Sequence, residues 1–250
     1  MIDFIRALSF LTILPIGRHL SHDDKGLARS MAFYPLAGLV IGGLSALAFC
    51  LLSSLFPKPL ALWLTLGLSV LLTGGLHLDG FSDTLDGIGC RGTREKTLEV
   101  MKDSRVGAFG AMGLLFLIVA KYLALDQLTT RAAAYALVLA AVMGRASMVL
   151  VCYRSPYARA AGGLAKLFTE NLGTRELVFA LASALGLALL LSGLKGAVLF
   201  SGMGVFSLGY RHFFLKKLGG VTGDILGAAN ELNELLCLLL LVVLEKTAAV

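Results

Sequence analysis

Long apolar stretches recur along this chain and limit what it can fold into. Five of them exceed about 17 residues, the length that a helix needs to cross the hydrocarbon core of a bilayer. Only 15% of the 250 residues are charged, whereas an ordinary soluble domain carries about 25%. The sequence therefore predicts an all-α, polytopic helical membrane protein whose surroundings are a lipid bilayer.

Seven transmembrane helices are predicted, at 31–56, 60–76, 107–125, 132–152, 177–194, 196–210 and 225–244. The sixth is short and rich in glycine, and only Lys195 separates it from the fifth. The first 16 residues carry Asp3 and Arg6 among apolar neighbours, which favours an N-terminal interfacial helix over a spanning helix or a signal peptide. No repeat or linker divides the chain, so we expect residues 1–250 to form a single domain.

The basic residues are distributed unevenly over the segments between the predicted spans. Sixteen of the 22 fall in the N-terminal segment and in the loops at 77–106, 153–176 and 211–224. The positive-inside rule assigns such loops to the cytoplasm, with the N-terminus inside and the C-terminus outside. The net charge of +6 does not point to nucleic acid as a partner, because basic residues in a membrane protein mostly set its orientation.

Three aspartates follow the second predicted span in the stretch HLDGFSDTLDG, residues 77–87. On a helix, the spacing of Asp79, Asp83 and Asp86 puts all three on one face, where like charges repel unless a cation lies between them. Carboxylates with few other ligands suit Mg²⁺, which commonly bridges to substrate phosphates. A solvated loop is the alternative. His77 is a candidate ligand or base, or else a capping residue.

A second acidic group lies in the last predicted span. Asn230, Glu231 and Glu234 share a helix face, roughly 8–15 Å inside the membrane if the helix starts near Ile225. Carboxylates at that depth are costly and usually functional. We expect the start of this helix to pack beside the aspartates, so that both glutamates join one metal site.

Basic residues supply candidate partners for this negative charge. Arg145 lies midway along the fourth span, where its guanidinium can pair with a buried glutamate or bind a phosphate, and we expect it to border the same cavity. The loop RSPYARAAGG adds Arg154, Tyr157 and Arg159 as candidate anchors for a polyanion. The alternative is that these loop residues only set the topology.

Residues 74–111, GGLHLDGFSDTLDGIGCRGTREKTLEVMKDSRVGAFGA, resemble the signature region of the cobalamin synthase (adenosylcobinamide-GDP ribazoletransferase) family. RSMAFYPLAGLVIG, PYARAAGG and GAANELNELL resemble that family as well, in the same order over nearly the whole chain. The family's usual small residues around the aspartates are replaced here by Phe81, Ser82 and Leu85, but all three carboxylates are present.

The resemblance implies an Mg²⁺-dependent enzyme with its active site on the cytoplasmic side of a prokaryotic inner membrane. It would join adenosylcobinamide-GDP to α-ribazole or its 5′-phosphate and release GMP, a late step of cobalamin biosynthesis. The resemblance leaves open whether the protein forms a homo-oligomer. With the resemblance, Asp79, Asp83 and Asp86 would hold the Mg²⁺, and the residue pattern adds Glu231 and Glu234 as candidate metal ligands. The catalytic candidates, including the general base, are Asp83, Asp103 and Glu231. The substrate-binding candidates are His77, Arg91, Arg105, Arg145, Arg154, Tyr157, Arg159 and Asn230.

Two other functions remain to be weighed. A CDP-alcohol phosphotransferase carries a D-x2-D-G motif that Asp83 to Gly87 fits, but the rest of that family's motif is missing. A cation transporter also buries carboxylates and an arginine, but its halves often show matched broken helices, and no inverted repeat is visible here. P-loop, serine-hydrolase and zinc-protease motifs are absent from the sequence.

Overall fold

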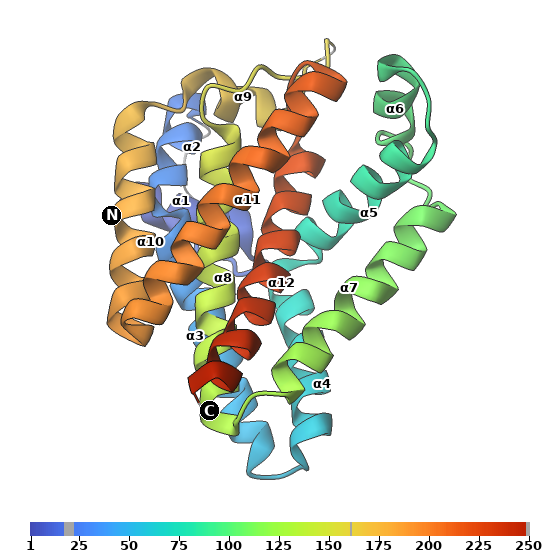
Figure 1. The fold of residues 1–250 in the computed structure, drawn as a ribbon. Helices are drawn as coiled ribbons and strands as arrows, with labels where there is room; N and C mark the ends of the chain where they lie inside the picture. Colours follow the sequence, from blue (N-terminus) through green and yellow to red (C-terminus); the bar gives the residue numbers. More distant parts are fainter. Residues whose placement is uncertain (18–22, 161, 249–250) are drawn as a thin grey trace.

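The structure, a computed structural model, describes residues 1–17, 23–160 and 162–248. Arg18, one of the basic residues of the N-terminal segment, lies outside these ranges. The regular structure within them is helical apart from one isolated β-bridge. The helices are α1 (Ile2–Leu11), α2 (Asp24–Ser30), α3 (Tyr34–Ser53), α4 (Lys58–Thr73), α5 (Leu76–Gly89), α6 (Arg94–Val100), α7 (Ala108–Asp126), α8 (Thr130–Cys152), α9 (Leu164–Asn171), α10 (Thr174–Ser192), α11 (Leu194–Leu218) and α12 (Gly223–Ala248), with a 3₁₀ turn at Met31–Phe33 (Figure 1).

The helices that qualify as membrane spans are fewer than the seven predicted. Among the described residues, five segments are long and apolar enough, and a sixth arises if the bent pair α4–α5 counts as one crossing. The five are Asp24–Ser53, Ala108–Asp126, Thr130–Cys152, Thr174–Ser192 and Gly223–Thr247. The predicted sixth span is helical, as α11, but its glycines, serines and terminal basic residues lower its hydropathy. The chain is thus a polytopic helical membrane protein with five or six candidate spans.

A sharp bend separates α4 from α5. Gly74 and Gly75 adopt positive φ angles of 62° and 68°, a conformation that glycine reaches without the steric cost of a side chain. The two helices meet at 90°. The predicted span at 60–76 therefore ends at this turn, and the aspartate segment continues as a separate helix that slants from the end of α4 toward α6 (Figure 1).

Helix α8 forms the centre of the bundle, with 83% of its apolar window buried. Helix α3 packs closely against it because Gly38 and Gly42 present no side chain there. A Cβ atom at Gly38 would lie 2.5 Å from the carbonyl oxygen of Ala141. Small residues at a helix interface allow this close approach, which is how helices commonly associate within a membrane.

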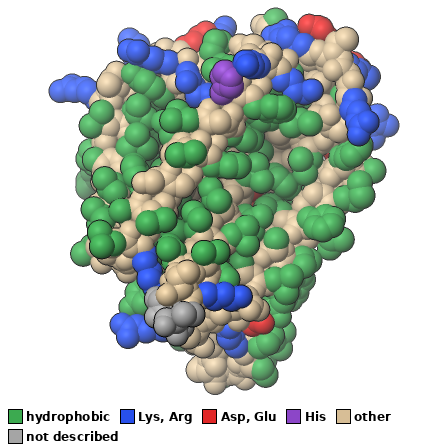
Figure 2. Space-filling view, viewed as in Figure 1, with side chains coloured by type: hydrophobic (Ala, Val, Ile, Leu, Met, Phe, Trp, Pro, Cys, Tyr) green, Lys and Arg blue, Asp and Glu red, His purple; other side chains and the backbone are tan. Residues whose placement is uncertain are grey.

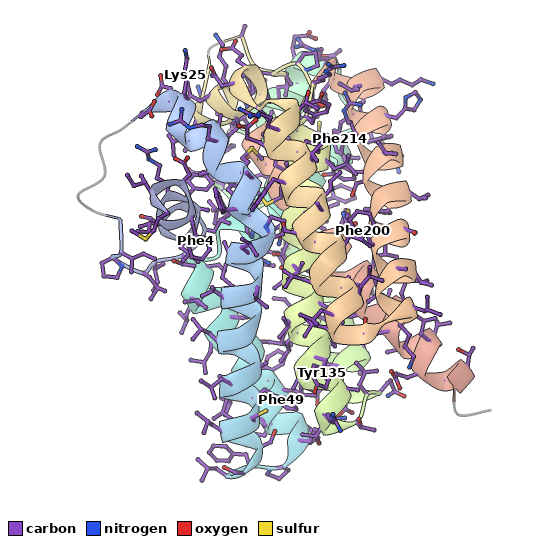
Figure 3. All side chains as sticks on the ribbon, turned by 90° about the vertical axis from the view of Figure 1, so that its left-hand side faces the viewer. Phe4, Lys25, Phe49, Tyr135, Phe200 and Phe214 are labelled. Atoms are coloured by element: carbon purple, nitrogen blue, oxygen red, sulfur yellow. The ribbon has the colours of Figure 1, made fainter. Side chains whose placement is uncertain are left out.

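The N-terminal segment contains α1, whose ten residues are too few to cross a bilayer. Ala7, Leu8 and Leu11 are buried, and Figure 3 places Phe4 of this helix beside α3. A short helix packed on the outside of the bundle agrees with the predicted N-terminal helix, and its position at the membrane interface remains a prediction.

The surface separates into an apolar middle and a basic end. In Figure 2, Lys and Arg side chains gather at the end that carries α2, α6 and α9, and hydrophobic side chains cover most of the middle. The loop between α3 and α4 and the turn between α7 and α8 lie at the other end (Figure 1). The loops that are rich in basic residues in the sequence thus come together at one end of the folded molecule.

Candidate functional site

The three aspartates lie on α5 but differ in their surroundings. Asp79 is exposed, Asp83 is half-buried, and Asp86 is buried. The carboxylate of Asp86 accepts hydrogen bonds of 2.8 Å from the backbone amides of Gly107 and Gly110, at the start of α7. These amides have no partner within their own helix, so Asp86 caps α7 from outside and fixes it against α5.

Helix α12 crosses α5 at the aspartates. A Cβ atom at Gly80 would lie 2.9 Å from the Cα and carbonyl oxygen of Asp224, and one at Gly227 would lie 3.3 Å from the Cα of His77. The two backbones therefore approach as closely as glycine permits. This crossing brings Asp224 beside the aspartate segment, and Asp83 lies within electrostatic reach of both Asp224 and the guanidinium of Arg159.

Arg159 connects the loop after α8 to this crossing. Its guanidinium donates to the carboxylate of Asp224 at 2.6 Å and to the carbonyl oxygen of Met101 at 3.1 Å. The loop is held there by a β-bridge between Tyr157 and Val221. The tertiary structure thus brings Arg159, one of the predicted anchors, to the aspartates.

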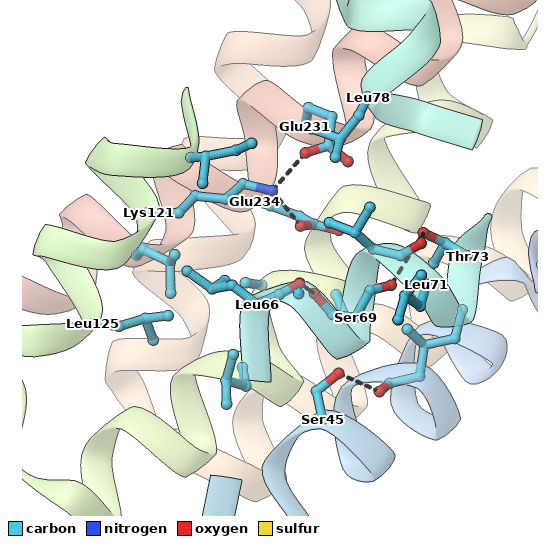
Figure 4. A pocket seen from close by; sticks show the side chains of 18 of the residues that line it. Ser45, Leu66, Ser69, Leu71, Thr73, Leu78, Lys121, Leu125, Glu231 and Glu234 are labelled. Atoms are coloured by element: carbon cyan, nitrogen blue, oxygen red, sulfur yellow. Dashed lines mark hydrogen bonds and ion pairs between the residues drawn. The ribbon is translucent and has the colours of Figure 1, made fainter. Parts of the chain in front are cut away.

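The glutamates of α12 form a network of four charged side chains with Lys121 and Arg145, here called the charge quartet. Lys121 Nζ donates to Glu231 and to Glu234, at 2.6 Å in each case (Figure 4). The guanidinium of Arg145 pairs with Glu234 and lies 3.4 Å from the Nδ1 of His77. Two cations balance two carboxylates, so the quartet is electrically neutral within the bundle.

The quartet and Asp79 border separate cavities. Glu231 and Glu234 line a cavity of about 460 Å³ together with Lys121 and Arg145. His77, Asp79 and Asp224 line another, of about 180 Å³. The prediction that α12 packs beside the aspartate segment is therefore confirmed, but the expectation that the glutamates and Arg145 share the cavity of the aspartates is wrong. Lys121 and Arg145 already neutralise the two glutamates, which therefore do not need a metal ion as their partner.

Asn230 supports the quartet, since its side-chain amide donates to Glu231 at 3.2 Å and to Glu234 at 3.0 Å. It is fully buried, and its amide oxygen has no hydrogen-bond partner among the described residues. The Nε2 of His77 likewise has none. His77 lines the smaller cavity, and it contacts the quartet through Arg145.

The other predicted residues lie at the basic end. Arg91 and Arg154 are exposed, each with a positive φ angle, and Arg154 stacks on the ring of Tyr153. The hydroxyl of Tyr157 donates to the carbonyl oxygen of Gly162. Among the described residues, none of these three side chains makes a hydrogen bond or ion pair with the aspartates.

Asp103 and Arg105 pair with each other in the loop before α7, at 2.7 Å. Hydrogen bonds from the Arg105 guanidinium, and from its backbone amide, lower the pKa of Asp103 to about 2. A carboxylate with so low a pKa is a weak proton acceptor. The structure therefore gives less support to Asp103 as a general base.

The sequence reasoning did not select Lys121 or Asp224 as site residues. Lys121 falls within the third predicted span, at 107–125, and it is buried inside α7. A lone lysine in an apolar helix, together with two glutamates and one arginine in other spans, was a signal of charge pairing. The sequence indicates the role of Asp224 less clearly, because that role depends on where α12 crosses α5.

Comparison with known proteins identifies the family. The family model described as "CobS: Cobalamin-5-phosphate synthase" matches residues 3–242. The chain belongs to this family. An adenosylcobinamide-GDP ribazoletransferase of Geotalea daltonii is 41% identical over 236 residues, which cover 94% of this chain and 95% of that protein. One of Syntrophobacter fumaroxidans is 42% identical over 240 residues, covering 94% and 96%.

A third member of the cobalamin-5-phosphate synthase family, from Escherichia coli K12, is 39% identical over 245 residues, which cover 95% of this chain and 98% of the relative. No solved structure matches the chain. The resemblance of the aspartate segment and the three shorter motifs to this family is therefore confirmed. These relatives give no support to the CDP-alcohol phosphotransferase or the cation transporter.

Proposed function

We propose that this chain, as a single membrane domain, catalyses the reaction for which its relatives are named, adenosylcobinamide-GDP ribazole transfer. Adenosylcobinamide-GDP is joined to α-ribazole or α-ribazole 5′-phosphate, and GMP is released. The step belongs to cobalamin biosynthesis, in agreement with the description of the matching family.

The observation that carries the proposal is the crossing of α5 and α12. It gathers Asp79, Asp83 and Asp224 with Arg159 around backbones held together by Gly80. Displacement at a pyrophosphate requires positioning and neutralisation of charge more than covalent catalysis. Carboxylates that bind a cation, beside a guanidinium that binds phosphate, supply both.

The donor chemistry of this cluster fits Mg²⁺. Among the described residues, no three His, Cys, Asp or Glu side chains form a ready-made metal cage. Mg²⁺ does not require one, because it keeps several waters and is usually bound by one or two carboxylates together with substrate phosphates. We assign Asp79 and Asp224 as the ligands of the ion. The guanidinium of Arg159 would then release Asp224 and bind a phosphate oxygen instead. A bound Mg²⁺ neutralises charge at the pyrophosphate.

The reaction forms one oxygen–phosphorus bond and breaks another. A ribose hydroxyl of the acceptor attacks the phosphorus that carries the cobinamide side chain, and GMP leaves with the electron pair of the broken bond. The hydroxyl proton passes to a carboxylate. Glu231 is paired with Lys121, and Asp103 is paired with Arg105. Among the described residues, the side chain of Asp83 makes no ion pair or hydrogen bond. We therefore assign to Asp83 the role of general base, which accepts this proton.

The same proposal places the active site on the cytoplasmic side. Helix α5, which carries the aspartates, runs toward α6 (Figure 1), at the end of the molecule where Lys and Arg side chains gather (Figure 2). The positive-inside rule assigns that end to the cytoplasm. Both substrates and GMP are water-soluble, which agrees with a site that opens to the cytoplasm.

The test is GMP release by the purified protein in lipid nanodiscs, supplied with adenosylcobinamide-GDP, the acceptor and Mg²⁺. We expect Asp83→Asn to lower turnover by at least about 100-fold, the lower contribution of a general base, without changing the Mg²⁺ dependence. Asp79→Asn should raise the Mg²⁺ concentration required. Asp126→Asn, at the opposite end of α7 beside Lys58, is the control and should be unaffected. A wild type that releases no GMP with either acceptor would refute the proposal.

A further inference from the structure

The cavity of about 460 Å³ beside the charge quartet has a mostly apolar wall, with the quartet at one end and a few hydroxyl side chains. It is enclosed by α3, α4, α7, α8 and α12. Figure 4 shows Lys121, Glu231 and Glu234 at one end and Ser45 at the other. Its volume falls within the range of about 300–1,000 Å³ that is typical of ligand sites.

This cavity lies away from the aspartates, on the other side of the bend between α4 and α5. Helix α4 provides Trp63 to Thr73, all before the bend, whereas α5 provides only Leu78. On α12 the cavity is lined by Glu231, Glu234 and Leu238, and the smaller cavity by residues 223–227. A water-soluble ligand bound at the aspartates therefore does not occupy it.

The cavity opens on the side of α4, toward the surface that we assign to the bilayer. Trp63 and Leu71 line the cavity and are 52% and 65% exposed. The surrounding surface of α4 and α7 is apolar, with exposed Leu64, Leu68 and Phe116. Hydrocarbon chains of the bilayer therefore surround this opening.

The polar end of the cavity offers no net charge to a ligand. The quartet is balanced, and the Lys121 ammonium already donates to both glutamates. A charged ligand therefore finds no unpaired charge of opposite sign there. The apolar part of the cavity is a poor site for water, and it loses the dispersion contacts of its walls when it is empty. The favoured occupant is an uncharged hydrocarbon chain.

We propose that this cavity binds one acyl chain of a bilayer phospholipid, which enters beside α4 and leaves its headgroup outside. The chain fills the space between α4 and α7 and supports α4, the helix that carries the bend and the aspartate helix after it. Because lipid surrounds the opening at high concentration, even a small gain in dispersion energy is enough to fill the cavity.

Gly67 provides a selective test. It lines the cavity, and a Cβ atom added there would meet nothing within 4 Å, so a large side chain can occupy the space of the ligand. Gly186 on α10 also has open space around it but lies outside both cavities, which makes Gly186→Phe the matched control. Both substitutions replace a helix-interior glycine, which favours the helix in the same way.

Native mass spectrometry of the intact protein, extracted gently into detergent, measures the share of chains that retain one phospholipid. We expect a phospholipid-bound species for the wild type and Gly186→Phe, and a share reduced by roughly tenfold for Gly67→Phe, which corresponds to about 1.4 kcal/mol of binding free energy. Added phospholipid should raise the melting temperature of the wild type but not that of Gly67→Phe. If that variant does not fold, the smaller Gly67→Leu should give the same loss.

Two results would overturn the proposal. One is a Gly67 variant that keeps the wild-type share of bound phospholipid. The other is a wild type that carries only detergent, because the cavity would then accept any hydrocarbon chain without retaining a lipid from the membrane. The assay measures no turnover, so its outcome is independent of the proposed transferase activity.

Discussion

Removing the ammonium group of Lys121 should destabilise the protein more than removing any exposed lysine. Its Nζ atom lies 2.6 Å from a carboxylate oxygen of both Glu231 and Glu234, and only 10% of its side chain is exposed. Lys121→Met keeps an apolar side chain of similar length. It leaves two buried carboxylates facing the single guanidinium of Arg145, so the bundle gains one uncompensated negative charge.

The size of the effect follows from the burial of that charge. Breaking a buried ion pair by removing one partner typically costs about 3–5 kcal/mol, because the remaining charge stays desolvated. Glu231→Gln in the Lys121→Met background restores neutrality, so the double variant should recover most of this loss, with a coupling energy of about 2–3 kcal/mol. Lys195→Met breaks a partly exposed pair with Glu245 and should cost less than about 1 kcal/mol.

The measurement is denaturant unfolding in detergent micelles, followed by the fluorescence of Trp63, the only tryptophan in the chain. The wild type, both single variants, the double variant and the Lys195→Met control are compared under the same conditions. The reasoning is refuted if Lys121→Met is no more destabilising than Lys195→Met. It is equally refuted if the double variant is less stable than Lys121→Met, because the quartet would then not be held together by charge balance.

Three further predictions concern the aspartate helix and the orientation of the chain. Gly80→Leu should force α5 away from the backbone of α12, 2.9 Å from the added Cβ, and abolish GMP release, whereas Gly43→Leu, which meets open space, should keep it. Asp86→Ala removes the acceptor of two amides at the start of α7 and should lower the free energy of unfolding by about 1–2 kcal/mol; an unchanged stability would contradict the capping role. Cysteines placed at Arg94 and Lys166 should both react with an impermeant label only from the cytoplasmic side, and labelling from opposite sides would contradict the topology.

The sequence by itself determined the class of the protein and the positions of its acidic groups. Hydrocarbon offers no partner for backbone polar groups, and a continuous apolar stretch of about 17 residues or more has the length with which a helix crosses a membrane while pairing these groups within itself. The spacing of Asp79, Asp83 and Asp86 fixes their common helix face before any packing is known. The depth of Glu231 and Glu234 in the last helix follows from counting residues along it.

Only the tertiary structure decided which of these charges meet. Asp83 and Asp86 are close in sequence, yet Asp86 is bound by the amides of α7 while Asp83 is free of such bonds among the described residues. Glu231 faces Lys121, 110 residues away. Local spacing places a side chain on a face of its own helix, but the rotation and crossing of two helices determine what that face contacts. Those depend on close approaches such as the one at Gly80, which the pattern along a single helix does not encode.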